Sequence, residues 1–197
     1  SGAVIVLSKA THAGGVTLNG HRLLGACAAR TIIAAPANGV TITGAGRLQD
    51  LSVQGGSDAQ SITVPPDEKL VLQGVIVERQ GVRFTGRLEA DDVLFRAIGG
   101  LLGPRPARAI WSANGTGVLS RIAVEHRGDE SIRVGGPEGH VEIRDLVVTS
   151  TTPSIVTADN DAVLVITRAL LTGASAHAAN DAQLELEDAT FAAGTVA

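Results

Sequence analysis

The residues best suited to chemistry are one aromatic side chain and a set of cations. Trp111, the only tryptophan, lies 28 residues after Arg83 and 22 residues before Arg133. Guanidinium groups attract the face of an indole ring, and they also bind carboxylates through paired hydrogen bonds. If the fold stacks these three residues, they predict a site that binds an acidic sugar. Arg105 and Arg108 add two cations shortly before Trp111.

The candidates for acid–base catalysis are His126, Arg133 and His177. Histidine is the side chain whose unperturbed pKa suits proton transfer near neutral pH, and an arginine can neutralise a substrate carboxylate. The sequence places no nucleophile beside these residues. They are therefore weak catalytic candidates, and the pattern leans away from an enzyme.

Metal and cofactor sites are not expected. Cys27 is the single cysteine and lies in an apolar stretch, which predicts a small buried hydrophobic residue rather than a zinc ligand or a nucleophile. Asp159 and Asp161 are too isolated from other carboxylates for a calcium site. We expect no cofactor.

Composition excludes several classes of protein. The 197 residues suit one domain, and 44% hydrophobic residues with 18% charged residues exclude disorder. The net charge of −4 argues against nucleic-acid binding. No apolar run approaches the roughly 18–20 residues of a transmembrane helix, and the chain shows no signal peptide.

A pattern repeats along the chain: apolar, any, apolar, two polar or glycine residues, apolar, any, apolar. One copy runs from Leu70 to Val77 and another from Val141 to Val148. The alternation predicts strands with one buried face, and the inserted pair predicts a tight corner between two strands. The residue after the pair recurs with a mean step of about 23 residues, at 51, 75, 93, 122, 146, 169 and 189.

These repeats predict an all-β, right-handed parallel β-helix of about eight coils with three short strands per coil. An antiparallel β-sandwich is the alternative, but it would need hairpin turns at shorter spacing. Phe84, Phe95 and Phe191 fall on inward positions and are interpreted as core residues. We expect a single domain over residues 1–197 that belongs to, or was excised from, a longer protein.

Stacked coils would align equivalent residues in columns. The second residues of the corner pairs form one predicted column: Asp50, Gly74, Asp92, Arg121, Asp145, Arg168 and Asp188. From Asp92 onward their charges alternate in sign, and we hypothesise that the attraction between them fixes the register between coils. The outward residues of the third strand form a second predicted column: Thr63, Arg83, Trp111, Arg133, Val156 and His177. The insertion 96–108 lies beside this column and is a candidate contact surface.

The opening of the chain, with the strand Val4–Leu7, the segment Thr11–Leu18 and the segment Leu23–Ile33, resembles the first coils of the pectin-lyase-like superfamily of right-handed parallel β-helices. The resemblance implies a substrate groove along the third wall in the catalytic members. Asp91–Asp92 and Gly139–His140 echo two polygalacturonase motifs, but the other polygalacturonase elements and the pectinesterase motifs are missing.

Function remains open between three classes at this point. The first is a non-catalytic scaffold, secreted or on the cell surface, that binds a glycan or a protein along one wall through Arg83, Arg105, Arg108, Trp111 and Arg133. The second is a carbohydrate-active lyase or hydrolase on acidic polysaccharide, which would use Arg83, Arg133 and one of the two histidines. The third is a module that assembles end to end, because an uncapped solenoid exposes strand edges.

Overall fold

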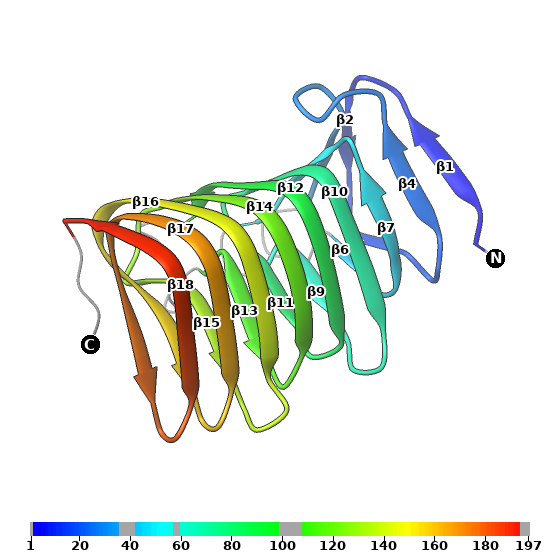
Figure 1. Ribbon diagram of the computed structural model, residues 1–197. Coiled ribbons are helices and arrows are strands. Elements are labelled where there is room, and N and C mark those ends of the chain that lie inside the picture. The colour runs from blue at the N-terminus through cyan, green and yellow to red at the C-terminus, as the bar shows by residue number, and fades with distance from the viewer. Residues whose placement is uncertain (1, 36–41, 57–59, 99–107, 194–197) are drawn as a thin grey trace.

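The computed structural model describes residues 2–35, 42–56, 60–98 and 108–193. Within these ranges the chain forms strands and turns, wound into a parallel β-solenoid of about seven turns. Figure 1 shows the coils stacked along one axis, with the two termini at opposite ends of the stack. The all-β solenoid is confirmed, with nearly the expected number of coils. The right-handed sense of the winding stays a prediction.

Each coil begins on a first wall and passes through a corner onto a second wall. In the first coils the two walls are formed by separate strands. These are β1 (Val4–Leu7), β4 (Arg22–Gly25) and β7 (Gly46–Gln49) on the first wall, and β2 (Thr11–Ala13), β5 (Ile32–Ala34) and β8 (Ser52–Gln54) on the second. Later coils use one long strand for both walls: β10 (Lys69–Glu78), β12 (Arg87–Ile98), β14 (Thr116–His126), β16 (His140–Asp159), β17 (Val163–Ala179) and β18 (Gln183–Ala192).

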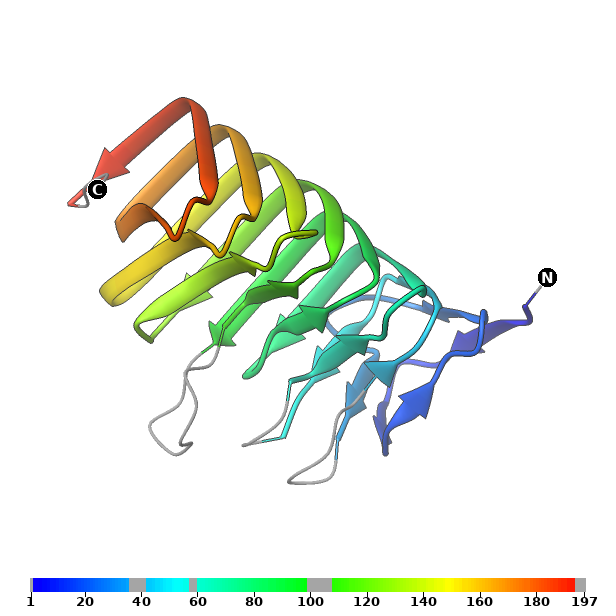
Figure 2. The same cartoon turned by 90° about the horizontal axis from the view of Figure 1, so that it is seen from below.

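The third wall closes each coil. Its strands are β3 (Val16–Thr17), β6 (Ile42–Thr43), β9 (Ile62–Val64), β11 (Val82–Phe84), β13 (Ile110–Ala113) and β15 (Glu130–Gly135), followed by the last parts of β16 and β17. Figure 2 shows these walls from below, as a staircase of similar steps.

Every strand pairing between the described strands is parallel, and each joins one coil to the next. Leu146 of β16 pairs with Ile122 of β14 on one side and with Ala169 of β17 on the other. Residues about two dozen apart therefore lie side by side, at the strand spacing of roughly 4.8 Å. This register confirms the repeat found in the sequence and excludes the antiparallel sandwich.

Columns of aliphatic side chains fill the interior. Leu72, Ile143 and Ile166, for example, occupy one inward column and are almost fully buried. Phe84 and Phe95 are completely buried, and Phe191 packs against the core from the last described coil. Burying one such side chain contributes about 1.5–3 kcal/mol, so the continuous core stabilises the stack along its length.

The corner column adopts the left-handed backbone that the inserted polar pair predicted. The φ angles of its seven residues lie between +51° and +59°, from Asp50 to Asp188. Gly74 also has a positive φ of +59°, and a Cβ there would lie 2.7 Å from the Asp50 Oδ1 atom. From Asp50 onward, a left-handed residue at this corner interrupts the alternation, which turns the strand onto the next wall.

The alternating charges of this column form pairs at one of the expected steps. The Arg168 guanidinium donates two hydrogen bonds to Asp145, at 2.6 and 2.7 Å, and holds the pKa of that carboxyl below its ordinary value. Arg121 instead donates to Asp91, the first residue of the neighbouring corner pair, at 2.5 Å. Among the described residues, only one of the four expected steps from Asp92 to Asp188 therefore forms an ion pair, and Arg121 forms a diagonal pair outside the column.

The predicted outward column of the third wall needs one correction. Arg133 pairs with Thr157, and Thr157 pairs with His177, whereas Val156 pairs with Ile132 and is fully buried. The ladder shifts by one residue between Glu130 and Ile132. A slip of one residue exchanges the two faces of a strand, so Val156 belongs to the core and Thr157 to the column.

Candidate functional site

Trp111 lies on the outer face of the third wall. Its neighbours Ile110 and Ser112 in β13 are buried, while the indole itself is only partly buried. Arg83 of β11 and Arg133 of β15 are its register partners in the coils on either side. The structure therefore brings together the three residues that the sequence suggested, and the indole faces outward.

The cations that contact the indole are Arg83 and Arg108. The guanidinium carbon of Arg83 lies 4.5 Å from the ring centroid of Trp111, and that of Arg108 lies 4.9 Å from it. The expected sandwich of Trp111 between Arg83 and Arg133 is wrong, because the Arg133 side chain is directed to carboxylates instead. A cation on an exposed aromatic face contributes about 0.5–1 kcal/mol, so these contacts chiefly hold the side chains in place.

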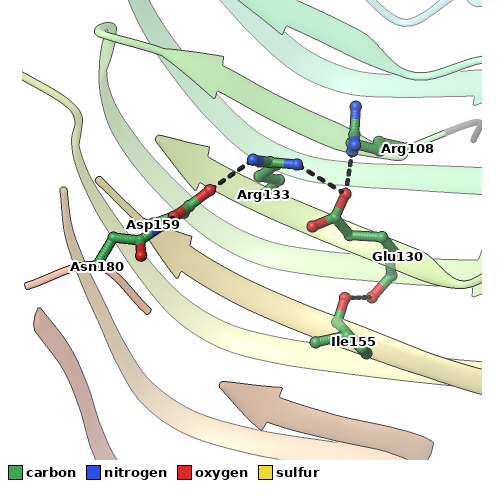
Figure 3. A network of polar contacts seen from close by, with 7 residues as sticks. Arg108, Glu130, Arg133, Ile155, Asp159 and Asn180 are labelled. Carbon is green, nitrogen blue, oxygen red and sulfur yellow. Dashed lines mark hydrogen bonds and ion pairs between the residues drawn. The ribbon is translucent and has the colours of Figure 1, made fainter. Parts of the chain in front are cut away.

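Arg133 belongs to a chain of ion pairs that crosses successive coils (Figure 3). Its Nη2 atom donates to Asp159 Oδ2 at 2.5 Å, and its Nη1 atom lies 3.8 Å from Glu130 Oε2. Arg108 donates from Nε to the same Glu130 carboxylate. Asn180 donates to the other oxygen of Asp159 at 2.6 Å.

This network is largely shielded from water and internally balanced. The side chains of Arg108, Glu130 and Asp159 are 11–14% exposed, and that of Arg133 is 33% exposed. Two guanidinium groups face two carboxylates, so the network has little net charge to offer a ligand. Glu130 and Arg133 belong to β15, whereas Arg108 and Asp159 come from the coils on either side, so the network joins successive coils of the third wall.

Arg83 is different, because no ion pair compensates its charge among the described residues. It has Trp111 as its aromatic partner and reaches the outer surface of the wall. The carboxylates of Glu130 and Asp159 are already engaged by Arg108 and Arg133. Arg83 is therefore the cation of this cluster that is best placed to attract an anion.

A shallow groove of about 340 Å³ borders the indole. Its lining residues are Arg108, Trp111, Ser112, Ala113, Asn114, Arg133, Gly135, Gly136 and Asn160. Gly136 has a φ of +87°, and a Cβ there would lie only 1.9 Å from Asn114 Oδ1. Two glycines in a row leave part of the groove without side chains, so a ligand could approach the backbone closely.

A larger hollow of about 630 Å³ lies on another part of the solenoid. It is lined by hydroxyl and small side chains from Ser150 to Ser154 and from Gly173 to Ser175, together with Ala193. It has no charged or aromatic lining residue. We therefore take the smaller groove beside Trp111 as the candidate site, because it combines an aromatic surface with donors.

The catalytic candidates are not brought together. His126 ends β14 and is 1% exposed, whereas Arg133 and His177 lie on the outer face of the third wall, two coil steps apart. Burial lowers the pKa of His126 to about 4 and outweighs the opposing effect of Gly128, Asp129 and Glu130. Its imidazole is therefore neutral at pH 7, and the candidate trio forms no shared site.

Sequence reasoning missed the residues that engage Arg108 and Arg133. Glu130 and Asp159 come from different coils, and the register shift beside Glu130 hides their proximity. Asn180 is the third such residue. The sequence carried no signal for Asp159, because the outward position predicted nearest to it was Val156, which the structure places in the core. Arg105 lies outside the described residues, as does most of the insertion 96–108.

No group of three or more His, Cys, Asp or Glu side chains in the described chain is arranged to hold a metal ion. The same residues contain no helix long and apolar enough to cross a membrane. Comparison with known proteins adds no relative: no family model, no curated protein and no solved structure matches the chain. The function must therefore be argued from the site itself.

Proposed function

We propose that this chain is a non-catalytic binding scaffold of a secreted or cell-surface protein, and that its third wall binds an acidic glycan. The observation that carries this proposal is Arg83, a cation without an ion pair among the described residues, held 4.5 Å from the partly buried ring of Trp111, which lines a groove. The resemblance of the opening coils to the pectin-lyase-like superfamily supports it, because catalytic members bind polysaccharide along this wall.

The groove and the Arg83 guanidinium, which contacts the Trp111 ring but does not line the groove, together offer the two kinds of contact that an acidic sugar needs. The C–H face of a pyranose ring can pack on the accessible part of the indole, and the uronate carboxylate can accept hydrogen bonds from the Arg83 guanidinium. Asn114 and Asn160 place amide groups along the same groove, where sugar hydroxyls need partners. Neutral sugars would lose the ionic contact.

Rigidity supports the same conclusion. The wall behind the groove is a continuous parallel sheet, and the ion pairs of Arg108 and Arg133 fix adjacent coils. A site that is already in its binding geometry loses little conformational entropy when the ligand arrives. A flat, open groove also suits one segment of a long polymer better than a small molecule, which favours deep pockets.

The test is calorimetric titration with oligogalacturonate and with a neutral oligosaccharide of equal length. The acidic ligand should bind more tightly, and Trp111→Ala or Arg83→Ala should each weaken its binding by about tenfold or more. Arg168→Ala is the matched control, since it removes the same charge from an exposed corner residue far from the groove.

Two results would contradict the proposal. Equal affinity for the acidic and neutral ligands would remove the role of Arg83, and unchanged affinity of Trp111→Ala would remove the role of the groove. The same mixtures should be followed by ultraviolet absorbance, because appearance of an unsaturated product would show a lyase instead of a binding scaffold.

A further inference from the structure

The second wall carries a mainly apolar column on its outer face. Val147 and Leu170 are each 43% exposed, and Leu94 and Ala123 are half-buried. The column takes one residue from each coil, in register from β10 to β18: Ile76, Leu94, Ala123, Val147, Leu170 and Thr190. It is separate from the groove beside Trp111, which lies on the third wall.

We propose that two copies of this chain form a dimer in which their second walls pack face to face and their stacks run in opposite directions. A twofold axis relates the two copies. It runs along the strand direction, midway between β14 and β16. The apolar column of one copy is thus covered by the same column of the second copy, and the third wall remains free.

The corner column beside the apolar residues restricts where this axis can lie. Its charges alternate from coil to coil, and its side chains reach the surface: Asp92, Arg121, Asp145, Arg168 and Asp188. An axis through the coil of Asp145 would set Arg121 against Arg168 of the second copy, and carboxylates against carboxylates. An axis between two coils shifts the match by one step and sets opposite charges together.

The apolar residues select one of the positions between coils. With the axis between β14 and β16, Leu94 faces Leu170 of the second copy and Ala123 faces Val147. An axis one coil earlier would set Leu170 against Ser52, which is buried and offers no surface. An axis one coil later would set Ala123 against Thr190. The chosen position therefore covers the most apolar surface.

Charge supports the same position. Arg121 faces Asp145 of the second copy, and Asp92 faces Arg168. Each of these contacts occurs twice, because a twofold interface uses the same surface on both copies. An axis along the strands also leaves the two facing sheets aligned, as in stable sheet packing.

The columns on either side bring no like charges together in this register. After the apolar column, Glu125 faces Thr149 of the second copy, and Arg96 faces Thr172. Before the corner column, each charged residue again faces an uncharged one: Asp91 with Thr167, Arg144 with Ser120, and Glu187 with Gln73. The whole outer face of the wall is thus self-complementary.

The size of the interface sets the expected affinity. The column spans six coils. At about 4.8 Å per coil and a width of about 17 Å, the wall contributes about 500 Å² per copy, or about 1,000 Å² in total. Interfaces of this size are at the low end for specific complexes, so we expect a dissociation constant in the micromolar range.

Analytical ultracentrifugation of the 197-residue chain tests the dimer. The mean mass should rise with concentration and level off at twice the mass of the chain, because a twofold interface closes. Val147→Glu places a charge in the apolar column and should weaken dimerisation by about tenfold or more. Val118→Glu is the matched control and should dimerise as the wild type does, since Val118 is 50% exposed on the first wall. A monomer up to millimolar concentration, or equal weakening by both substitutions, would overturn the proposal.

Exchange of charges between two variants tests the register. Asp92→Arg sets cations against each other at the contact with Arg168, and Arg168→Asp sets carboxylates against each other, so each variant alone should dimerise about tenfold more weakly. An arginine fits position 92, because Arg121 and Arg168 adopt the same positive φ at this corner. An equimolar mixture restores opposite charges at both contacts and should form a heterodimer with about the wild-type affinity.

Circular dichroism verifies that each variant is folded. Unchanged dimerisation of Asp92→Arg, or a mixture that associates no better than its components, would overturn the proposal. No glycan enters these measurements, so their outcome is independent of the glycan titrations.

Discussion

The burial of His126 predicts a specific dependence of stability on pH. The imidazole is 1% exposed, and the Gly128 backbone, Asp129 and Glu130 offset the effect of its burial only in part. Burial disfavours the charged ring and lowers its pKa from 6.5 to about 4. The perturbation is a change of pH from 7.5 to 4.5, compared between the wild type and His126→Leu.

The sign follows from proton binding in the two states. Between pH 6.5 and pH 4 the unfolded chain carries a proton on His126, whereas the folded chain does not. The stability that His126 contributes is therefore complete above pH 6.5 and is lost as the pH falls toward 4. Each unit of pKa difference corresponds to about 1.4 kcal/mol, so the full window corresponds to about 3–4 kcal/mol, of which about 2–3 kcal/mol is lost by pH 4.5.

The assay is urea unfolding at several pH values across this window. His126→Leu has a similar volume and cannot titrate, so its unfolding free energy should fall by about 2–3 kcal/mol less than that of the wild type between pH 7.5 and pH 4.5. His140→Gln is the matched control, because the imidazole that it removes is half exposed rather than buried. That variant should keep the wild-type slope.

Parallel pH profiles for the wild type and His126→Leu would refute this reasoning. They would show that the protonated imidazole of the folded chain is solvated by water or hydrogen-bonded to an acceptor. A wild-type stability that rises as the pH falls through the same window would reverse the sign and refute it as well.

Two further predictions concern the ion pairs between coils. In Arg168→Asp, the new carboxylate lies in the column between Asp145 and Asp188, so that three successive coils carry like charges at this corner. The melting temperature measured by calorimetry should therefore fall, and an unchanged melting temperature would contradict the role of the corner column in fixing the register. Glu130→Gln leaves the nearly buried Arg108 without its carboxylate and should lower the unfolding free energy, measured by urea titration, by about 2–3 kcal/mol. A loss of less than about 0.5 kcal/mol would show that the ion-pair network is not needed for stability.

The repeat is readable in the sequence because its signals are local. Each corner combines period-two alternation with an inserted residue that tolerates positive φ, as Asp92 and Asp145 do. The stack then follows, because parallel strands of equal phase must lie one above another to bury their apolar faces. The same phase is sufficient to predict that Trp111 lies between Arg83 and Arg133 in the strand register, as it does.

The position of Val156 is not readable in the same way, because it depends on a local irregularity. The ladder shifts beside Glu130 and again between Thr149 and Ser154. The residue types at each shift are ordinary for a turn, so the sequence does not reveal that the strand register changes there. A slip of one residue moves a side chain from the outer face to the core, so an error of this size changes the content of the site.

The amino-acid sequence alone determined the coil, its corners and the columns, because these depend on backbone angles and on alternation within a few residues. The tertiary structure decided which partner each long side chain takes. Arg133 turns to Asp159, and Arg108 reaches both Trp111 and Glu130. A guanidinium on a flexible stem can reach carboxylates in several neighbouring coils, and only the positions of all of them together select among these partners.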